Sequence, residues 1–276
     1  MRFRFTKMQG LGNDFVVIDA INQAVDLSSA QIRFIADRNF GVGCDQLLMV
    51  ENPTNPNADF KYRIFNADGS EVAQCGNGAR CFARFVRDQR LCDKDQITVD
   101  THAGQLVLHL TADGLVRVNM GVPKHLPSQI PLLADEEKLL YSVMLDGHEV
   151  NFSALSMGNP HAVIQVEDVN RAPVAIWGAM LECHTLFPER VNVGFMQVVD
   201  RQNIKLRVYE RGAAETLACG SGACAAAVAG IELGRLSQRV NVELPGGSLI
   251  IEWAGRNQSV FMTGPAVSVF EGQIAL

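Results

Sequence analysis

The stretch CGNGARC at residues 75–81 returns 144 residues later as CGSGACA at residues 219–225. In each copy a cysteine stands before a Gly-x-Gly turn and a helix-like run, 79–86 in the first copy and 223–233 in the second. A cysteine in that position lies at a helix N-terminus, where unpaired N–H groups and the positive end of the helix dipole favour an anion. We therefore expect Cys75 and Cys219 to be reactive thiols with lowered pKa values.

The repeat extends over nearly the whole chain. The polar residues Asn66 and Glu210 each stand nine residues before their cysteine, and three strand-like runs follow each helix, at 97–101, 105–110 and 115–120 and at 240–244, 247–253 and 260–263. A period of about 145 residues is too long for a solenoid and predicts two like domains related by pseudo-symmetry. Many short strands around one helix predict an α+β fold, in which each half is a curved, barrel-like, mainly antiparallel sheet around a central helix. Prolines at 123, 127 and 131 place the domain boundary near residue 120.

Composition narrows the range of partners. The 276 residues are 47% apolar with a net charge of -6, and they contain no dense run of Lys or Arg, so no nucleic-acid partner is expected. The sequence contains no run of about 18 apolar residues, which is the length that would predict a membrane-spanning helix. We therefore expect a cytoplasmic protein. The seven cysteines are an odd number that argues against a disulfide framework. Their spacings do not match zinc motifs with a His pair, so no metal is expected.

Two equivalent thiols suggest a particular chemistry. If a substrate carbon lies between them, one thiolate removes a proton from one face while the opposite thiol protonates the other face, which inverts a stereocentre without redox change. Repulsion between like charges favours one thiol and one thiolate over two thiolates. No lysine motif for pyridoxal phosphate is apparent, so no cofactor is expected. The amides of residues 76–79 and 220–223 are suited to holding a substrate carboxylate that gains charge.

Further polar residues occupy equivalent places in the two copies. An isolated Asn is usually a turn residue, but paired occurrence makes these residues candidates for substrate binding. The pairs are Asn13 with Asn159, Gln46 with Asn192, and Asn66 with Glu210, and Arg211 adds a cation. His161 is a candidate for biasing the protonation of a thiol.

Several motifs together resemble a known family. The chain carries GNDF at 12–15, GVGCDQ at 41–46, NADGS at 66–70 before CGNG, GNPH at 158–161, and ERG at 210–212 before ACGSG at 218–222. These motifs are similar to the full signature of diaminopimelate epimerase, they occur in the same order, and they cover nearly the whole chain.

The resemblance implies a cofactor-independent isomerase that converts LL- to meso-2,6-diaminopimelate in the synthesis of lysine and peptidoglycan precursors. It implies that Cys75 and Cys219 are the acid/base pair, with His161 and Glu210 tuning them. It implies a substrate site made of Asn13, Gln46, Asn66, Gly76, Asn77, Asn159, Asn192, Glu210, Arg211, Gly220 and Ser221. Arg211 suits the distal carboxylate, and Glu210 with the asparagines suits the distal ammonium. The resemblance also implies a homodimer, and domains at residues 1–119 with 265–276 and at residues 120–264.

Three other interpretations are open on the sequence. A proline racemase-like enzyme would use two cysteines on a similar scaffold. A nucleotide-binding protein would use Gly220 and Gly222 as part of a dinucleotide fingerprint, with Glu243 about 20 residues further on. A non-enzymatic interaction protein would leave the paired cysteines unexplained.

Overall fold

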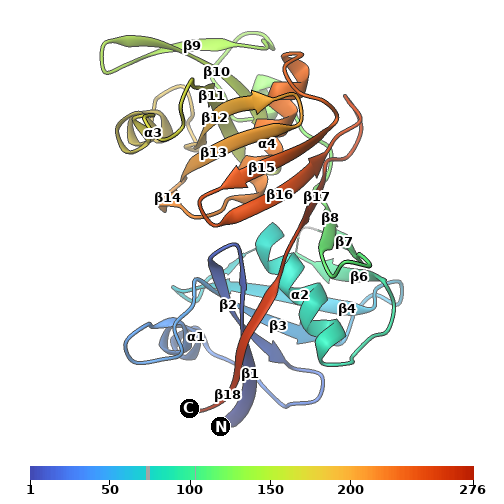
Figure 1. The fold of residues 1–276 in the computed structure, drawn as a ribbon. Helices are drawn as coiled ribbons and strands as arrows, with labels where there is room; N and C mark the ends of the chain where they lie inside the picture. The colour runs from blue at the N-terminus through green and yellow to red at the C-terminus, as the bar shows by residue number, and fades with distance from the viewer. Residues whose placement is uncertain (73–74, 103) are drawn as a thin grey trace. The chain divides into compact units, whose positions relative to one another are not determined.

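The structure is a computed structural model, and it describes residues 1–72, 75–102 and 104–276 (Figure 1). The chain forms two compact units, Met1–Asn119 with Thr263–Leu276, and Met120–Met262. Each unit contains one cysteine motif at the start of a long helix.

The first unit is a curved sheet around the helix α2. Its elements are β1 (Arg2–Gly10), β2 (Asn13–Asp19), α1 (Ser29–Ala36), β3 (Gln46–Glu51), β4 (Phe60–Asn66), β5 (Glu71–Val72), α2 (Gly76–Asp88), β6 (Gln96–Thr101), β7 (Gly104–Leu110), β8 (Val116–Asn119) and β18 (Val267–Ala275). Strand β2 is parallel to β3, β3 is antiparallel to β4, and β4 is parallel to β6. The last strand, β18, pairs antiparallel with β1, so the two termini lie side by side (Figure 1).

The second unit repeats this order. Its elements are η1 (Pro127–Gln129), β9 (Tyr141–Leu145), β10 (His148–Ser156), β11 (Pro160–Gln165), α3 (Val174–Glu182), β12 (Asn192–Asp200), β13 (Asn203–Glu210), β14 (Ala214–Thr216), α4 (Gly220–Glu232), β15 (Arg239–Leu244) and β16 (Gly247–Glu252). Strand β17 (Phe261–Gly264) begins in this unit and ends in the first. Strand β11 is parallel to β12, β12 is antiparallel to β13, and β13 is parallel to β15. These pairings match those of the first unit strand for strand, which confirms the predicted α+β fold of two pseudo-symmetric halves.

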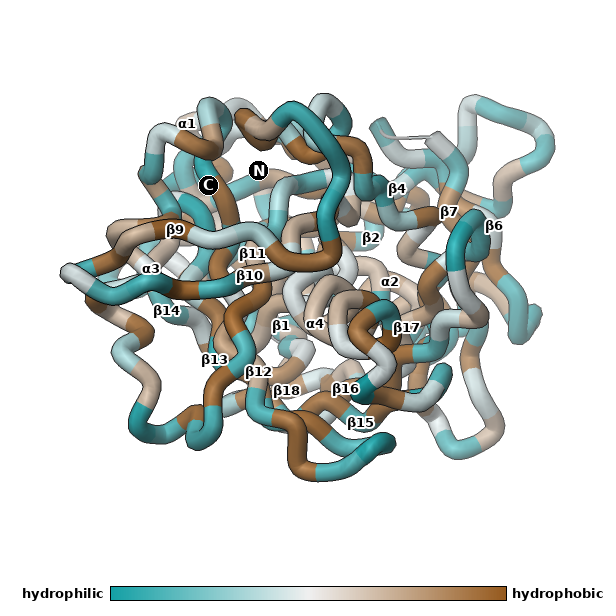
Figure 2. The backbone as a smooth tube through the Cα atoms, turned by 90° about the horizontal axis from the view of Figure 1, so that it is seen from above, coloured by the Kyte–Doolittle hydropathy of each residue, from teal (hydrophilic) through white to brown (hydrophobic). Residues whose placement is uncertain are grey.

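The buried side chains of the two central helices, α2 and α4, differ in size. Helix α2 buries Phe82, Phe85 and Val86, whereas α4 buries a run of alanines from 225 to 227. Helix α4 packs against β10 to β13 and against β15 and β16, and Figure 2 shows its pale coil among the brown apolar segments of those strands. Small side chains let this sheet approach the helix closely, because the distance between packed elements follows side-chain size.

A second apolar layer lies against each sheet. In the first unit Ile32 and Ile35 of α1 pack with Val16 of β2 and Leu47 of β3. In the second unit Val174 and Leu181 of α3 belong to a cluster with residues of β10, β11 and β12. The strands that carry the polar candidates are therefore held between two layers, which fixes the positions of their ends.

The structure corrects one detail of the motif. The Gly-x-Gly segment was expected to be a turn before the helix, but α2 and α4 begin at Gly76 and Gly220, so both glycines of each motif lie in the first helical turn. The strands β1, β5, β9, β10 and β14 were also not expected from the sequence.

Candidate active site

Each motif cysteine stands directly before a helix. Cys75 is the N-cap residue of α2 and Cys219 is the N-cap residue of α4, both with extended backbone. The first helical bonds run from Ala79 N to Cys75 O at 2.8 Å and from Ala223 N to Cys219 O at 2.9 Å. The predicted location of both thiols at helix N-termini is confirmed.

Close packing explains the second glycine of each motif. A Cβ atom on Gly78 would lie 2.6 Å from the hydroxyl of Tyr62, and a Cβ atom on Gly222 would lie 3.2 Å from Sγ of Cys219. Tyr62 is buried and its hydroxyl donates to the carbonyl oxygen of Cys75 at 3.4 Å. The glycines therefore let the helices start close to the sheet and leave room around the sulfurs.

In the first unit the strand register gathers the candidate residues. Gln46 on β3 pairs with Asn66 at the end of β4, and its Nε2 donates to Asn66 Oδ1 at 2.9 Å. Asn13, at the start of β2, accepts at Oδ1 from Asn77 Nδ2 at 3.3 Å and from Cys75 Sγ at 3.9 Å. Asn13 and Asn77 thus contact the Cys75 side of this half-site, while Gln46 and Asn66 form a neighbouring pair.

The second unit has the equivalent contacts. Asn159, just before β11, donates from Nδ2 to the hydroxyl of Ser221 at 3.3 Å, and that hydroxyl lies 3.7 Å from Sγ of Cys219. Asn192, at the start of β12, donates to the carbonyl oxygen of Pro160 at 2.9 Å. Its Oδ1 accepts from the backbone N–H of Arg211 at 3.0 Å. Asn192 therefore fixes the backbone on which Arg211 stands.

The environment of Cys219 contradicts the expected lowered pKa. Burial raises the pKa of Cys219 well above its usual range, and the Glu210 carboxylate raises this pKa further. Hydrogen bonds from Gly222 and Ser221 act in the opposite direction but do not compensate. Burial therefore outweighs the helix N-terminus, because removing a thiolate from water destabilises it more than a few N–H groups stabilise it. Cys219 is therefore a neutral thiol near neutral pH.

His161 is buried on β11 behind the second half-site. Burial lowers the pKa of its imidazole to about 3, with a smaller contribution from the charge of Arg211. The ring is therefore neutral at ordinary pH, and its Nε2 lies 3.0 Å from Oδ1 of Asn159. With Asn159 accepting, Nε2 carries the ring proton. His161 contacts the cysteine region through Asn159 and Ser221, and it carries no charge there.

The side chains of Glu210 and Arg211 each form a hydrogen bond with another part of the second unit. Glu210 accepts from the hydroxyl of Thr216 at 2.5 Å on the neighbouring strand β14. Arg211 is exposed, and its Nη1 donates to the carbonyl oxygen of Glu189 at 2.9 Å. Glu210 is the last residue of β13 and Arg211 follows it, so the carboxylate and the cation come from adjacent residues.

An ion cluster beneath Asn13 was missed from the sequence. Asp14 is bonded to Lys7 at 2.6 Å and to Arg38, whose two terminal nitrogens reach it at 3.0 and 2.8 Å, and Arg38 also reaches Asp45 at 2.8 Å. These two cations hold the pKa of the Asp14 carboxyl well below its usual range, although burial opposes them. The sequence did contain a sign of this cluster, because Asp14 and Asp45 are the acidic residues of the motifs GNDF and GVGCDQ.

Neither a metal cluster nor a spanning helix occurs in the described part of the chain. Over residues 1–72, 75–102 and 104–276, no group of three or more His, Cys, Asp or Glu side chains is placed to hold a metal ion. Across the same residues no helix is long and apolar enough to cross a membrane.

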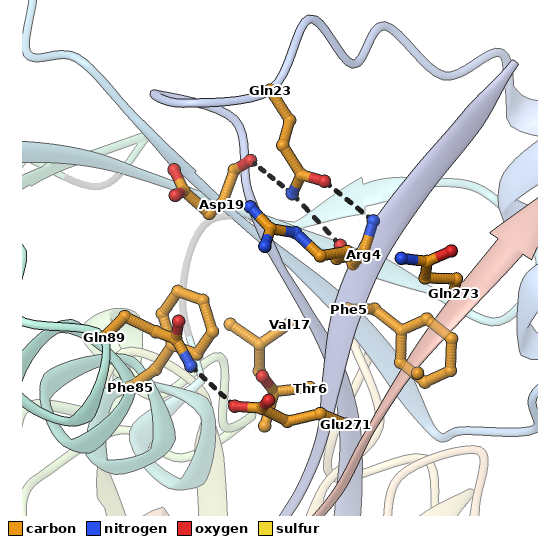
Figure 3. Close-up of a pocket in the computed structure, with 11 residues that line it drawn as sticks. Arg4, Phe5, Thr6, Val17, Asp19, Gln23, Phe85, Gln89, Glu271 and Gln273 are labelled. Atoms are coloured by element: carbon orange, nitrogen blue, oxygen red, sulfur yellow. Dashed lines mark hydrogen bonds between the residues drawn. The ribbon is translucent and has the colours of Figure 1, made fainter.

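A separate pocket of about 290 Å³ lies in the first unit, beside β1, β18 and the C-terminal end of α2 (Figure 3). Phe5, Val17 and Phe85 supply its apolar part, and Gln89 donates to Glu271 at 2.9 Å across it. No candidate site residue of the first half-site lines this pocket.

Comparison with known proteins decides the family. The family model described as diaminopimelate epimerase matches residues 5–126 and 153–269. The chain belongs to the diaminopimelate epimerase family. A diaminopimelate epimerase from an Azoarcus species is 60% identical over 276 residues, with all of both chains covered. One from Nitrosospira multiformis is 58% identical over 276 residues, covering 100% of this chain and 99% of the relative.

More distant solved structures share the fold of this diaminopimelate epimerase family member. A hydroxyproline epimerase from Agrobacterium vitis has a TM-score of 0.70 at 14% identity, covering 100% of this chain and 93% of its own. A protein from Pseudomonas aeruginosa described as a predicted epimerase has a TM-score of 0.69 at 17% identity, covering 99% of both chains. At such low identity the similarity establishes the fold alone.

Proposed function

We propose that this protein is a diaminopimelate epimerase, which interconverts LL- and meso-2,6-diaminopimelate by inverting one α-carbon. The observation that carries the proposal is the identity of 58% and 60% to diaminopimelate epimerases over the full chain. The repeated half-sites support it, because each presents a cysteine at a helix N-terminus. Asn13 contacts Cys75 directly, and Asn159 reaches Cys219 through the hydroxyl of Ser221.

In this proposal Cys75 and Cys219 are the two acid/base residues. One sulfur takes the proton from the α-carbon as a thiolate, and the other gives its proton to the opposite face, with the roles exchanged in the reverse reaction. The buried, protonated state of Cys219 suits the donor role first. The charge of Glu210 modulates Cys219 directly, and neutral His161 acts on it through Asn159 and Ser221.

Charge development at the substrate carboxylate is the main barrier. The first N–H groups of α2 and α4, at Gly76, Asn77, Gly220 and Ser221, lie at the positive ends of the helix dipoles and suit an anion. A carboxylate bound there is stabilised as the carbanion delocalises into it. The α-ammonium group of the substrate adds a positive charge beside the sulfurs, which favours formation of the one thiolate that the reaction needs.

The far end of the substrate is assigned to the polar residues on strand ends. Arg211 pairs with the distal carboxylate, and Glu210 receives the distal ammonium group. The amide side chains complete the site, namely Asn13, Gln46, Asn66, Asn159 and Asn192. A substrate with two amino-acid ends fits this set better than proline does, because proline has no second charged end.

The decisive experiment is turnover of LL-2,6-diaminopimelate by the purified protein, followed by chiral separation of the isomers. Turnover of L-proline in parallel tests the proline racemase interpretation, and proline turnover above diaminopimelate turnover would reject our assignment. Calorimetry with NAD tests the nucleotide interpretation. In the structure Gly222 lies inside α4 and packs on Cys219 and Val208, which explains the glycine without a nucleotide.

We further propose that the protein acts as a homodimer in the cytoplasm. Exposed apolar side chains on β18, at Val267, Val269 and Phe270, support a self-association surface, because such residues are favoured in interfaces. Sedimentation velocity gives the oligomeric state. If the protein is a monomer at micromolar concentration, the proposed homodimer is rejected, and the proposed epimerase activity still stands.

A further inference from the structure

Several polar and charged residues outside the proposed acid/base pair lie near Cys75, and the role inferred for them rests on the proposed function of Cys75. A chain of side-chain hydrogen bonds passes Cys75 and joins a buried cation to an anion. Arg80 Nη1 donates to Asn77 Oδ1 at 2.9 Å, and Asn77 Nδ2 donates to Asn13 Oδ1 at 3.3 Å. Asn13 Nδ2 in turn donates to Asp45 Oδ2 at 3.0 Å.

The two ends of this chain fix its direction. A guanidinium group can only donate, and an ionised carboxylate can only accept. Arg80 therefore requires the oxygen of the Asn77 amide, and Asp45 requires the nitrogen of the Asn13 amide. Each amide has one oxygen and one nitrogen, so the remaining atoms, Asn77 Nδ2 and Asn13 Oδ1, meet as donor and acceptor.

Both ends are themselves held in place. Arg80 is fully buried, and its Nε donates to the carbonyl oxygen of Pro265 at 3.0 Å within the same unit. Asp45 accepts from Arg38 at 2.8 Å through Oδ1 and from the backbone N–H of Asp14 at 3.1 Å through Oδ2. The direction of the chain is thus imposed by charged groups whose positions depend on the fold.

We propose that Asp45 and Arg80 are positioning residues that lock the Asn13 amide with its carbonyl oxygen toward Cys75. Asn13 Oδ1 lies 3.9 Å from Sγ of Cys75, so it accepts a hydrogen bond from the thiol and holds the S–H bond in one orientation. With the amide turned over, an N–H group would face the sulfur and stabilise the thiolate instead.

The equivalent contacts of the second unit run the other way. There His161 donates to Asn159, Asn159 donates to Ser221, and the Ser221 hydroxyl is left to donate to Cys219. Residue 160, which replaces Asp14 in the repeat, is Pro160, so the ion cluster belongs to the first half-site. The acceptor at Cys75 is therefore a specific property of the first unit.

Two further titratable side chains, those of Tyr62 and Cys81, lie close enough to Cys75 to influence its pKa. Tyr62 and Cys81 both interact with it electrostatically. Burial raises the pKa of Tyr62 well above its usual range and raises the pKa of Cys81 to about 12, so both are neutral near neutral pH. The charged groups near its partner Asn13 belong to the ion cluster and include Asp45.

The experiment measures the pH midpoint for alkylation of Cys75 by iodoacetamide, without substrate, from the mass of the Cys75 peptide. Asp45→Asn should lower this midpoint by about one pH unit, because an N–H donor that replaces the acceptor favours the thiolate by roughly one hydrogen bond. Asp59→Asn is the matched control, since Asp59 also accepts from a cation and a backbone N–H, Lys94 at 2.6 Å and Thr98 at 2.9 Å. It should leave the midpoint unchanged.

A double-mutant cycle separates orientation from simple loss of charge. In an Asn13→Ala background, Asp45→Asn should no longer shift the midpoint, because the amide through which it acts is gone. An equal shift in both backgrounds, or no shift in the parent, overturns the proposal. Should Asp45→Asn fail to fold, neutron diffraction on the parent protein decides: deuterons on the Asn13 atom that faces Asp45 support the proposal, and deuterons on the atom that faces Cys75 overturn it. These measurements need no turnover, so they can succeed or fail independently of the epimerase assignment.

Discussion

Replacing Gly222 by alanine should displace the sulfur of Cys219 without unfolding the protein. The added Cβ would lie 3.1 Å from Cγ2 of Val208 and 3.2 Å from both Cβ and Sγ of Cys219. Comfortable contacts between such atoms begin near ~3.5 Å. The cysteine side chain therefore has to move by about 0.3 Å, since Val208 is buried on the packed strand β13.

The expected effects on stability and on activity differ. Alanine in place of glycine favours the helix by about 1 kcal/mol, and overpacking costs about 1 to 3 kcal/mol. The free energy of unfolding should thus fall by no more than about 2 kcal/mol. A catalytic atom misplaced by ~1 Å can cost about 100-fold in rate. If the logarithm of the rate scales with displacement, a shift of about 0.3 Å costs roughly fourfold in kcat.

The assay is the initial rate of conversion of LL-diaminopimelate, measured beside urea unfolding of the same preparation. Gly194→Ala on β12 is the matched control, because its Cβ would have 3.4 Å to the nearest atom, Cδ1 of Leu206. Gly222→Ala at the parental rate would refute the packing argument. So would an equal loss of rate in Gly194→Ala.

Four further results are expected. Cys75→Ala and Cys219→Ala should each abolish epimerisation while circular dichroism shows a folded protein. Dialysis against a chelator should leave the rate unchanged, because the proposed acid/base groups all belong to the chain. Since burial lowers the pKa of His161 to about 3, only the unfolded state takes up its proton between about pH 6.5 and pH 3, so folding loses stability as pH falls through that range. His161→Gln should therefore show a shallower loss of stability in acid urea titrations than the parent, and an identical slope would contradict this. Asp14→Asn should lower the free energy of unfolding by about 3 kcal/mol, because the nearly buried Lys7 loses its carboxylate partner and keeps the neutral carbonyl oxygen of Gly43; a urea midpoint equal to that of the parent would contradict it.

The sequence predicted the repeated architecture because duplication leaves a record that needs no alignment. The paired motifs located both helix N-termini, and the equal spacing from Asn66 and Glu210 to the cysteines placed these residues at the ends of equivalent strands. The hairpin β9–β10 was missed, although Asp146 and Gly147 form a turn that favours hairpins. The prolines at 123, 127 and 131 instead predicted an irregular segment there.

The electrostatics could not be obtained from motif position. The helix N-terminus at Cys219 is visible in the sequence, but the burial of its sulfur is a property of the packed unit, and burial decides the direction of the pKa shift. The ion cluster of Lys7, Asp14 and Arg38 combines residues from three separate segments. Their proximity follows from the β1–β2 register and from the position of the loop after α1, neither of which a single sequence specifies.

Isotope exchange in heavy water tests the two-base claim most directly. When LL-diaminopimelate is converted in D₂O and stopped early, our account predicts deuterium at the inverted α-carbon of the meso product and little deuterium in the recovered LL substrate. The proton removed by one sulfur cannot return to the opposite face, where the other sulfur supplies its own solvent-derived deuteron. Product that retains the original proton at the inverted carbon would contradict the account.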